Sequence, residues 1–456
     1  SGLLGSAQLD QNSIASSREL LNRFVSFYSN ASYTYDDKYV LSGSIRWDRS
    51  NLWGTNSKYQ NKPLWSVGGS WNIYKEKFFQ ADFVDMLKLR ASYGIGGNIG
   101  RNTAPYLIAS YYDSSLVDGM AGSVNTPPNK DIRWEKTTTV NVGVDFALFR
   151  HRLSGTIEYY NKYSVDLLAA INGSPTQGFG YTTLMTNNGK MVNRGVEITL
   201  SGEIIRQKDF SWNASLLYAF NRNKVKHISV QPSLWDSRIS MPTSYPMVGK
   251  PLYGIYAYKW AGLNENGDPQ VYDAENNVTS GPARDYHALV YCGTTVPIHN
   301  ASLTNVLRYK GFEFSAMLIL DAGHKLRSSN IPSINMSNGR ITSTAKGIVD
   351  RWTQPGDVTD VPRLLFSNDT ENFNTHRTEL YRYSDLFVYD ASNIRLSNIS
   401  LAYRVPAHWC KKISLSGARL QFNVENVATF AFDSKANYDL GGKVKPNYVW
   451  GLYLNF

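Results

Sequence analysis

The chain has 456 residues, of which 42% are hydrophobic and only 18% are charged, and its formal net charge is +10. A soluble protein usually carries charge on about a quarter of its residues, whereas tyrosine (30), phenylalanine (19), tryptophan (11) and glycine (35) are abundant here. This composition argues against a set of ordinary globular domains and favours a sheet with one face in lipid. No stretch approaches about 18 consecutive apolar residues, so a membrane protein of this kind has to be a closed β-barrel.

Alternation with a period of two is the strongest signal along the chain. From Val140 to Leu148 every second residue is apolar and the residues between them are polar or small, which places the two kinds on opposite faces of a strand. Several such segments are longer than the 5–6 residues typical of a sandwich strand and carry aromatic residues at both ends. The predicted strands are 23–35, 38–50, 63–74, 86–97, 137–149, 152–166, 192–205, 210–224, 251–262, 298–309, 312–325, 389–404, 413–427 and 448–456.

The predicted connections alternate between tight turns and long loops. Tight turns are expected at 36–37, 149–152, 206–209 and 310–311, and long loops at 98–136, 167–191, 225–250 and 326–388. This is the layout of an outer-membrane barrel, with the long loops outside the cell. Strand directions counted from the two ends of the chain disagree at 251–262, so we expect one further strand, at Asp285–Cys292, and about fifteen in all.

The positive net charge suggests few partners. Basic residues are scattered without a Lys- or Arg-rich run, which excludes a nucleic-acid partner. The phosphates of lipopolysaccharide suit these residues better, and most of the basic residues are explained as solvated loop charges.

The two cysteines, Cys292 and Cys410, do not make a disulfide framework or a zinc site, and whether they pair is open. Ser1–Gly5 lacks the regions of a signal peptide, so we expect a chain that begins after processing or part-way through a longer protein.

Aromatic and glycine-containing segments recur along the chain in a specific order. They are Tyr33–Asp48, Trp71–Ile73, Leu87–Gly94 with Gly97 and Asn98, Ile132–Thr137, Val192–Glu197, Arg351 with Trp352, and the aromatic strand Tyr448–Phe456. In this order, and over nearly the whole chain, they resemble the SusC-like TonB-dependent transporters of Bacteroidetes.

The resemblance implies an all-β protein with a transmembrane antiparallel barrel of about 22 strands around a plug. It also implies nutrient import energised by TonB with ExbB and ExbD, and a SusD-like surface lipoprotein as a lid. We find no plug or TonB-box-like segment and only about 14–15 strands, so we expect residues 1–456 to be the C-terminal portion of the barrel, with no separate soluble domain. The plug and the first strands are then expected in a separate chain.

No motif points to catalysis, a cofactor or a metal. HExxH, GxSxG, Walker and CxxC patterns are absent from the sequence, and the seven histidines are single residues near turns and loops, without metal-ligand spacing. Asn264–Asp268 with Asp273 faintly resembles a calcium loop but lacks its spacing and its closing Glu, so a turn at Asn266-Gly267 explains it better. Catalytic residues, metal ligands and cofactors are therefore all expected to be absent.

Aromatic residues in the predicted long loops are the candidate substrate-binding residues. Aromatic rings stack on sugars and contact peptide side chains; the alternative is that these rings stabilise the loops or contact the lid. The candidates are Trp53, Tyr59, Tyr111, Tyr112, Tyr181 and Trp235, with Tyr106, Phe179 and Phe373 as further loop aromatics. Loop 326–388 is a better candidate for the lid interface because of its length and polar content.

Three functional classes compete. The first is active import of an oligosaccharide or oligopeptide through the barrel. The second is a plugless structural or adhesive outer-membrane barrel. The third, an enzyme on a barrel scaffold, requires a clustered acid and base that the sequence does not show.

Overall fold

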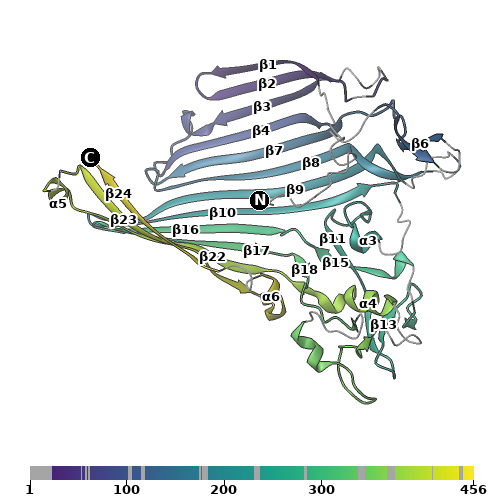
Figure 1. Ribbon diagram of the computed structural model, residues 1–456. Coiled ribbons are helices and arrows are strands. Elements are labelled where there is room, and N and C mark those ends of the chain that lie inside the picture. The colour runs from purple at the N-terminus through teal and green to yellow at the C-terminus, as the bar shows by residue number, and fades with distance from the viewer. Residues whose placement is uncertain are drawn as a thin grey trace, which may run out of the picture.

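The computed structural model describes residues 23–52, 54–56, 59, 62–100, 105–114, 119–173, 176, 183–230, 237–281, 285–336, 345–366, 375–412, 414–440 and 445–456. Its main feature is one antiparallel sheet of thirteen strands, which twists without closing (Figure 1). In sheet order the strands are β1 (Phe24–Tyr35), β2 (Tyr39–Ser50), β3 (Leu64–Asn72), β4 (Val84–Asn98), β7 (Glu135–Leu148), β8 (Leu153–Asn172), β9 (Thr183–Arg206), β10 (Phe210–His227), β16 (His299–Tyr309), β17 (Phe312–Ala322), β22 (Asn393–Arg404), β23 (Gly417–Ala431) and β24 (Asn447–Asn455). Among the described residues, β1 and β24 each have one neighbour and form the two edges.

The register keeps apolar and polar residues on separate faces of this sheet. Val144 lies opposite Leu89 on one side and Ile157 on the other, and a slip of one residue would move each of them to the other face. The same apolar row continues through Ile198, Tyr218, Ala301, Leu320, Ile394 and Phe430. The adjacent row, on the other face, holds Arg90, Gly143, Glu158, Glu197, Ala219, Asn300, Asp321 and Asn393.

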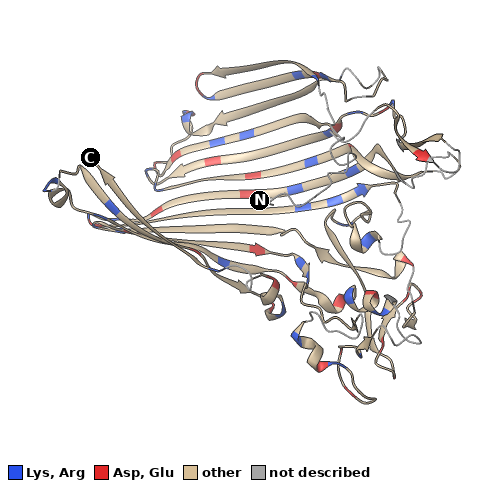
Figure 2. Ribbon diagram, viewed as in Figure 1, with Lys and Arg blue, Asp and Glu red and all other residues tan. Residues whose placement is uncertain are grey.

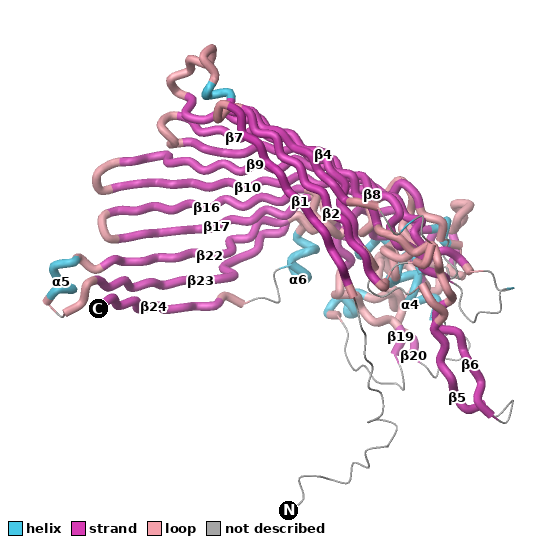
Figure 3. The backbone as a smooth tube through the Cα atoms, turned by 90° about the horizontal axis from the view of Figure 1, so that it is seen from above, coloured by secondary structure: helices cyan, strands magenta, loops and turns pink. Residues whose placement is uncertain are grey.

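The connections alternate between the two ends of the strands, as predicted. Those at one end, called here the short-turn end, are 36–38, 73–83, 149–152, 207–209, 310–311 and 405–416, and they include η1 (Ile73–Lys75) and α5 (Ala407–Lys411). Asp36 and Asp37 have φ of 50° and 52°, which is the left-handed pair that a tight hairpin turn requires. All the large insertions lie at the opposite end (Figure 3). Most of the predicted loop 167–191 is strand instead, because β8 and β9 extend into it.

Two predicted barrel strands are wrong. Segment 251–262 forms β11 (Gly254–Tyr258) and β12 (Trp260–Leu263), and the added strand at Asp285–Cys292 overlaps β15 (Leu289–Thr294). β11 pairs with β15 in a separate two-stranded sheet. All five residues of β11 are buried, whereas a membrane strand exposes one face to lipid. The disagreement in strand direction therefore disappears when segment 251–262 is taken out of the barrel and no strand is added at 285–292. The large sheet has thirteen strands rather than about fifteen.

The insertions 228–298 and 323–392 fold together into a structure that we call the loop layer. Its sheets are β11 with β15, β12 with β13 (Pro269–Tyr272) and β14 (Val278–Thr279), β18 (Lys325–Arg327) with β21 (Val388–Asp390), and β19 (Asn335–Met336) with β20 (Leu365–Phe366). Its helices are α3 (Ser237–Ser240), η3 (Tyr286–Ala288), η4 (Lys346–Asp350), α4 (Thr375–Arg382) and η5 (Asp385–Phe387).

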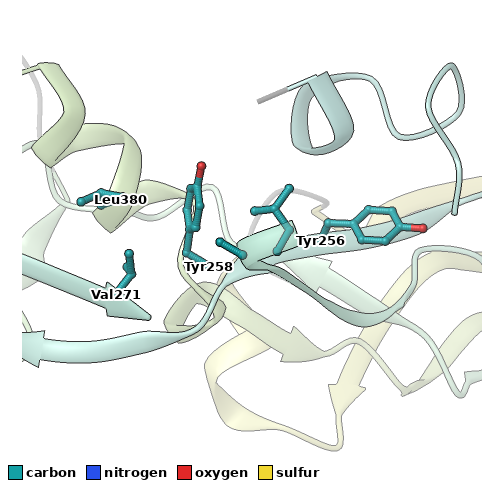
Figure 4. Packing of buried hydrophobic residues seen from close by; sticks show 6 residues of the cluster. Tyr256, Tyr258, Val271 and Leu380 are labelled. Atoms are coloured by element: carbon teal, nitrogen blue, oxygen red, sulfur yellow. The ribbon is translucent and has the colours of Figure 1, made fainter. Parts of the chain in front are cut away.

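The loop layer has its own buried core. Tyr256, Tyr258 and Val271 from the first insertion belong to one hydrophobic cluster with Leu380 from the second, and Tyr258 and Val271 lie beside Leu380 (Figure 4). Arg327 joins the insertions as well, because its guanidinium donates hydrogen bonds to the carbonyl oxygens of Tyr256 at 2.7 Å and Ser384 at 3.1 Å. These contacts hold the two insertions together in one folded unit at the end of the strands opposite the short-turn end.

The remaining elements are small. The hairpin of β5 (Ile108–Ser114) and β6 (Gly119–Thr126) projects from the insertion between β4 and β7 (Figure 3). The elements η6 (Ser434–Ala436) and α6 (Asn437–Leu440) lie between β23 and β24. Among the residues that the structure describes, no helix is both long and apolar enough to cross a membrane.

Candidate transport surface

The polar face of the sheet is the candidate transport surface, and over β2 to β4 it consists mainly of small residues. Ser42, Ser44, Ser66 and Gly68 line a shallow groove there together with Ser92. The hydroxyl groups of Ser44 and Ser66 are 2.6 Å apart and form a hydrogen bond across the strands. Short side chains keep this part of the wall flat and provide groups that accept and donate hydrogen bonds.

A charged cluster occupies the same face where β4, β7 and β8 meet. Nε of Arg90 donates to both carboxylate oxygens of Asp145, at 3.1 and 3.0 Å, and Nη2 donates to Glu158. The hydroxyl of Thr156 donates to Asp145 at 3.1 Å. The side chains of Arg90, Asp145 and Glu158 are 33%, 20% and 21% exposed. One arginine therefore binds two partly buried carboxylates. Figure 2 shows isolated charges of both signs on otherwise uncharged strands.

Replacing Arg90 by Met is expected to lower the free energy of unfolding by about 1–3 kcal/mol. The two carboxylates lose their shared partner, and Glu158 already lies opposite Glu197 in the β8–β9 register. Urea unfolding of the protein in liposomes measures the loss. Lys162→Met, in β8 on the same face, is the matched control because Lys162 lies opposite Thr139 and Asn193 and forms no ion pair with any residue that the structure describes; equal losses for the two variants would contradict the role of Arg90.

The opposite face carries aromatic residues near both ends of the strands, as predicted for a membrane-spanning sheet. At the short-turn end, the ring centroids are 6.3 Å apart for Tyr39 and Trp71, 5.9 Å for Phe83 and Phe149, and 4.5 Å for Phe312 and Tyr403. Towards the other end, the distances are 5.7 Å for Phe27 and Trp47, 5.6 Å for Trp65 and Tyr93, and 5.3 Å for Phe220 and His299. Such belts lie at the two membrane–water interfaces of a barrel.

The predicted loop aromatics fall into two groups. Trp53, Tyr181 and Trp235, like Phe179 and Phe373, lie outside the described residues. The described ones are Tyr59, Tyr106, Tyr111 and Tyr112.

The described candidates lie in different surroundings. The guanidinium carbon of Arg133 lies 4.7 Å from the ring centroid of Tyr59. Tyr111 and Tyr112 lie on opposite faces of β5 and are 73% and 53% exposed. Their role as substrate-binding residues therefore stays a prediction.

Sequence reasoning missed the charged cluster. Arg90 lies 55 residues from Asp145 and 68 residues from Glu158. The only signal available was that each charge takes a polar position in an alternating strand, and the cluster appears once β4, β7 and β8 are placed side by side.

The oxygen-rich turns of the loop layer bind backbone groups. Oδ1 of Asn264 accepts the N–H groups of Asn266 and Asp268, both at 2.9 Å, so the predicted turn at Asn266-Gly267 is confirmed. Oδ1 of Asp273 accepts in the same way from Glu275 at 3.0 Å. Within the described ranges, no group of three or more His, Cys, Asp or Glu side chains is placed to hold a metal ion.

The two cysteines are both free thiols. Cys292 lies in β15 of the loop layer and Cys410 in α5 at the short-turn end, at opposite ends of the strands (Figure 1). They do not form a disulfide with each other. Burial raises the pKa of the Cys292 thiol to about 11.

Alkylation of Cys292 is therefore expected to be slow at neutral pH. Only about a thousandth of this thiol is ionised at pH 8, and the rate should rise about tenfold per pH unit up to about pH 11. Maleimide kinetics on a Cys410→Ser variant measures this, with glutathione as the ordinary thiol for comparison. A rate that levels off near the pH at which glutathione does would contradict the burial of the thiol.

The two faces, the aromatic belts and the alternating connections define the wall of an outer-membrane β-barrel protein. The chain belongs to the family described as "TonB dependent receptor-like, beta-barrel", which it matches over residues 5–427. This confirms the expected barrel, the SusC-like TonB-dependent receptor family and the location in the outer membrane.

Relatives support the same assignment. The chain is 27% identical over 456 residues to TonB-dependent receptor P3 of Formosa agariphila, covering 94% of this chain and 43% of that protein. It is 25% identical over 427 residues to TonB-dependent receptor SusC of Bacteroides thetaiotaomicron, covering 89% and 40%. The fold is similar to the solved structure of the RagAB peptide transporter, with a TM-score of 0.76 at 23% identity over 95% of this chain and 48% of that one. The chain thus spans less than half the length of these relatives.

Proposed function

We propose that this chain is the C-terminal part of a barrel that imports a nutrient, an oligosaccharide or an oligopeptide, across the outer membrane. The observation that carries the proposal is the division of the sheet into a lipid face and a polar face lined with hydroxyl, amide and charged groups. A polar inner wall offers a solute hydrogen bonds in place of water. In this proposal TonB, with ExbB and ExbD, supplies the energy.

The proposal includes two protein partners. Further strands, in a plug-bearing part of the same transporter, pair with the free edges of β1 and β24, because unpaired backbone groups cannot face lipid. A SusD-like lipoprotein covers the end that holds the loop layer, where the segment 326–388 supplies part of the interface. Exposed Tyr111 and Tyr112 of the β5–β6 hairpin contact substrate at that end.

The test is uptake by cells that carry the intact transporter. Fluorescent oligosaccharides and oligopeptides are supplied with and without a protonophore, which removes the energy source of TonB. The proposal predicts uptake of one of the two classes and its loss with the protonophore. Purification of the transporter in detergent, followed by mass spectrometry, should recover the plug-bearing part and a lipoprotein. A barrel without either partner and without energised uptake is the plugless structural or adhesive protein instead.

A further inference from the structure

A pocket at the short-turn end of the sheet is lined by basic residues from neighbouring strands. Arg308 is the last residue but one of β16, Lys310 lies in the turn to β17, Arg404 ends β22 and Arg419 lies in β23. The only carboxylate that lines this pocket belongs to Glu313 of β17. We call this group of five residues the rim pocket.

The charges of the rim pocket do not balance. Oε2 of Glu313 accepts from Nε of Arg308 at 2.7 Å, and Oε1 accepts from Nη2 of Arg419 at 3.2 Å. Arg404 and Lys310 form no ion pair with any residue that the structure describes, and the ammonium of Lys310 lies 5.3 Å from the ring centroid of Tyr309. Four basic side chains against one carboxylate leave an excess of three positive charges in the pocket.

The strand register makes this imbalance costly. Arg404 lies directly opposite Arg419 in the pairing of β22 with β23. Like charges at opposite positions destabilise a strand pair. Where a sequence breaks a local rule in this way, the compensation is expected from a functional contact, and the rim pocket is therefore a candidate site for an anion.

The position of the rim pocket selects the kind of anion. Arg419 and Arg404 lie on the same face as Gln421 and Asn423, whereas Leu420 and Phe422 lie on the lipid face. The phosphates of membrane lipids meet the other face, on which Phe312 also lines the pocket, so they suit these basic side chains less well than an anion inside the barrel does. Glu313 already shows that a carboxylate fits between two of these guanidinium groups, which bind planar carboxylates well.

We propose that the rim pocket binds an acidic segment of a polypeptide that lies inside the barrel at its short-turn end. A carboxylate of that segment is held by Arg404 with Lys310 or Arg419, opposite the one supplied by Glu313. The inference rests on the proposed function, because it requires a closed barrel with protein inside it. It adds to that function a contact that fastens the internal domain to the β16–β23 side of the wall.

Photo-crosslinking in outer membranes tests this on the intact transporter. A benzophenone amino acid at Lys310 is expected to give a covalent product with a peptide of the transporter that contains at least two Asp or Glu residues. Arg404→Glu combined with Arg419→Glu should reduce that product at least tenfold, whereas Arg404→Lys should retain it. Lys412→Glu, on the same rim but outside the pocket, should leave it unchanged.

Different results would contradict the rim-pocket inference and the proposed function. Crosslinks to lipid, crosslinks to a segment without carboxylates, or no product at all would overturn the inference. Heat-modifiable migration on gels shows whether each variant is folded. If the variant with both Arg404→Glu and Arg419→Glu is not folded, Arg419→Gln provides a milder change. Energised uptake measured in the same cells separates the two claims. Uptake without the crosslink would contradict only the rim-pocket contact. Absence of energised uptake by the unmodified transporter would contradict the proposed function.

Discussion

Replacing Asp268 by Ala is expected to lower the local stability of the loop layer by about 3–5 kcal/mol. Asp268 accepts hydrogen bonds from Arg363 at 3.1 and 2.9 Å and from Nε of Arg377 at 2.7 Å. The side chain of Arg377 is only 4% exposed, and its burial lowers the pKa of this guanidinium. Without Asp268, two partly buried cations lose their counter-ion, and the contact between the two insertions weakens.

Hydrogen exchange of the intact protein measures this effect segment by segment. We expect faster exchange in β12, β13 and α4, with β7 and β8 of the large sheet unchanged. Glu265→Ala is the matched control, because Glu265 is an exposed acidic neighbour that forms no ion pair with any described residue. Uniformly faster exchange through the large sheet would mean that the loop layer is not a separate unit of stability.

Replacing Val144 by Arg is expected to cost about 2–4 kcal/mol of unfolding free energy if this residue lies near the bilayer midplane. Val144 lies between Leu89 and Ile157 on the apolar face, where a guanidinium has neither water nor a counter-ion. Urea-induced unfolding in liposomes measures the cost.

Asn141→Arg is the matched control in the same strand. Asn141 lies between Ser92 and Tyr160 on the polar face, so its replacement should cost much less. Equal costs for the two variants would show that the lipid face and the inner face have been assigned the wrong way round.

The strands of the large sheet were predictable because their residues obey one local rule. β7 was expected at 137–149 and spans Glu135–Leu148, and its alternation of apolar and polar residues needs no information from other segments. Segment 251–262 was predicted wrongly because apolar residues there are buried on both faces by a distant part of the chain. Tyr256 and Leu380 belong to one core, although no periodic pattern in the sequence connects them.

The candidate site was predictable only in its general character. Alternation showed that one face would be polar, but the partners of each charge depend on register. Glu313 contacts Arg419, which lies 106 positions further along the chain, and that contact follows only after β17, β22 and β23 are paired. The loop aromatics were identified from residue type alone, which does not reveal what each ring contacts, as Tyr59 beside Arg133 illustrates.

The central claim is that one face of this sheet meets lipid and the other lines the interior of a barrel. Spin labels placed singly at each position from Val140 to Leu148, in a protein with Cys292 and Cys410 replaced by Ser, test it directly in bilayers. Collision rates with oxygen, which dissolves in lipid, should peak at Val140, Val142 and Val144, and those with a water-soluble nickel complex at the positions between them. Equal rates at neighbouring positions, or a period other than two, would contradict the account.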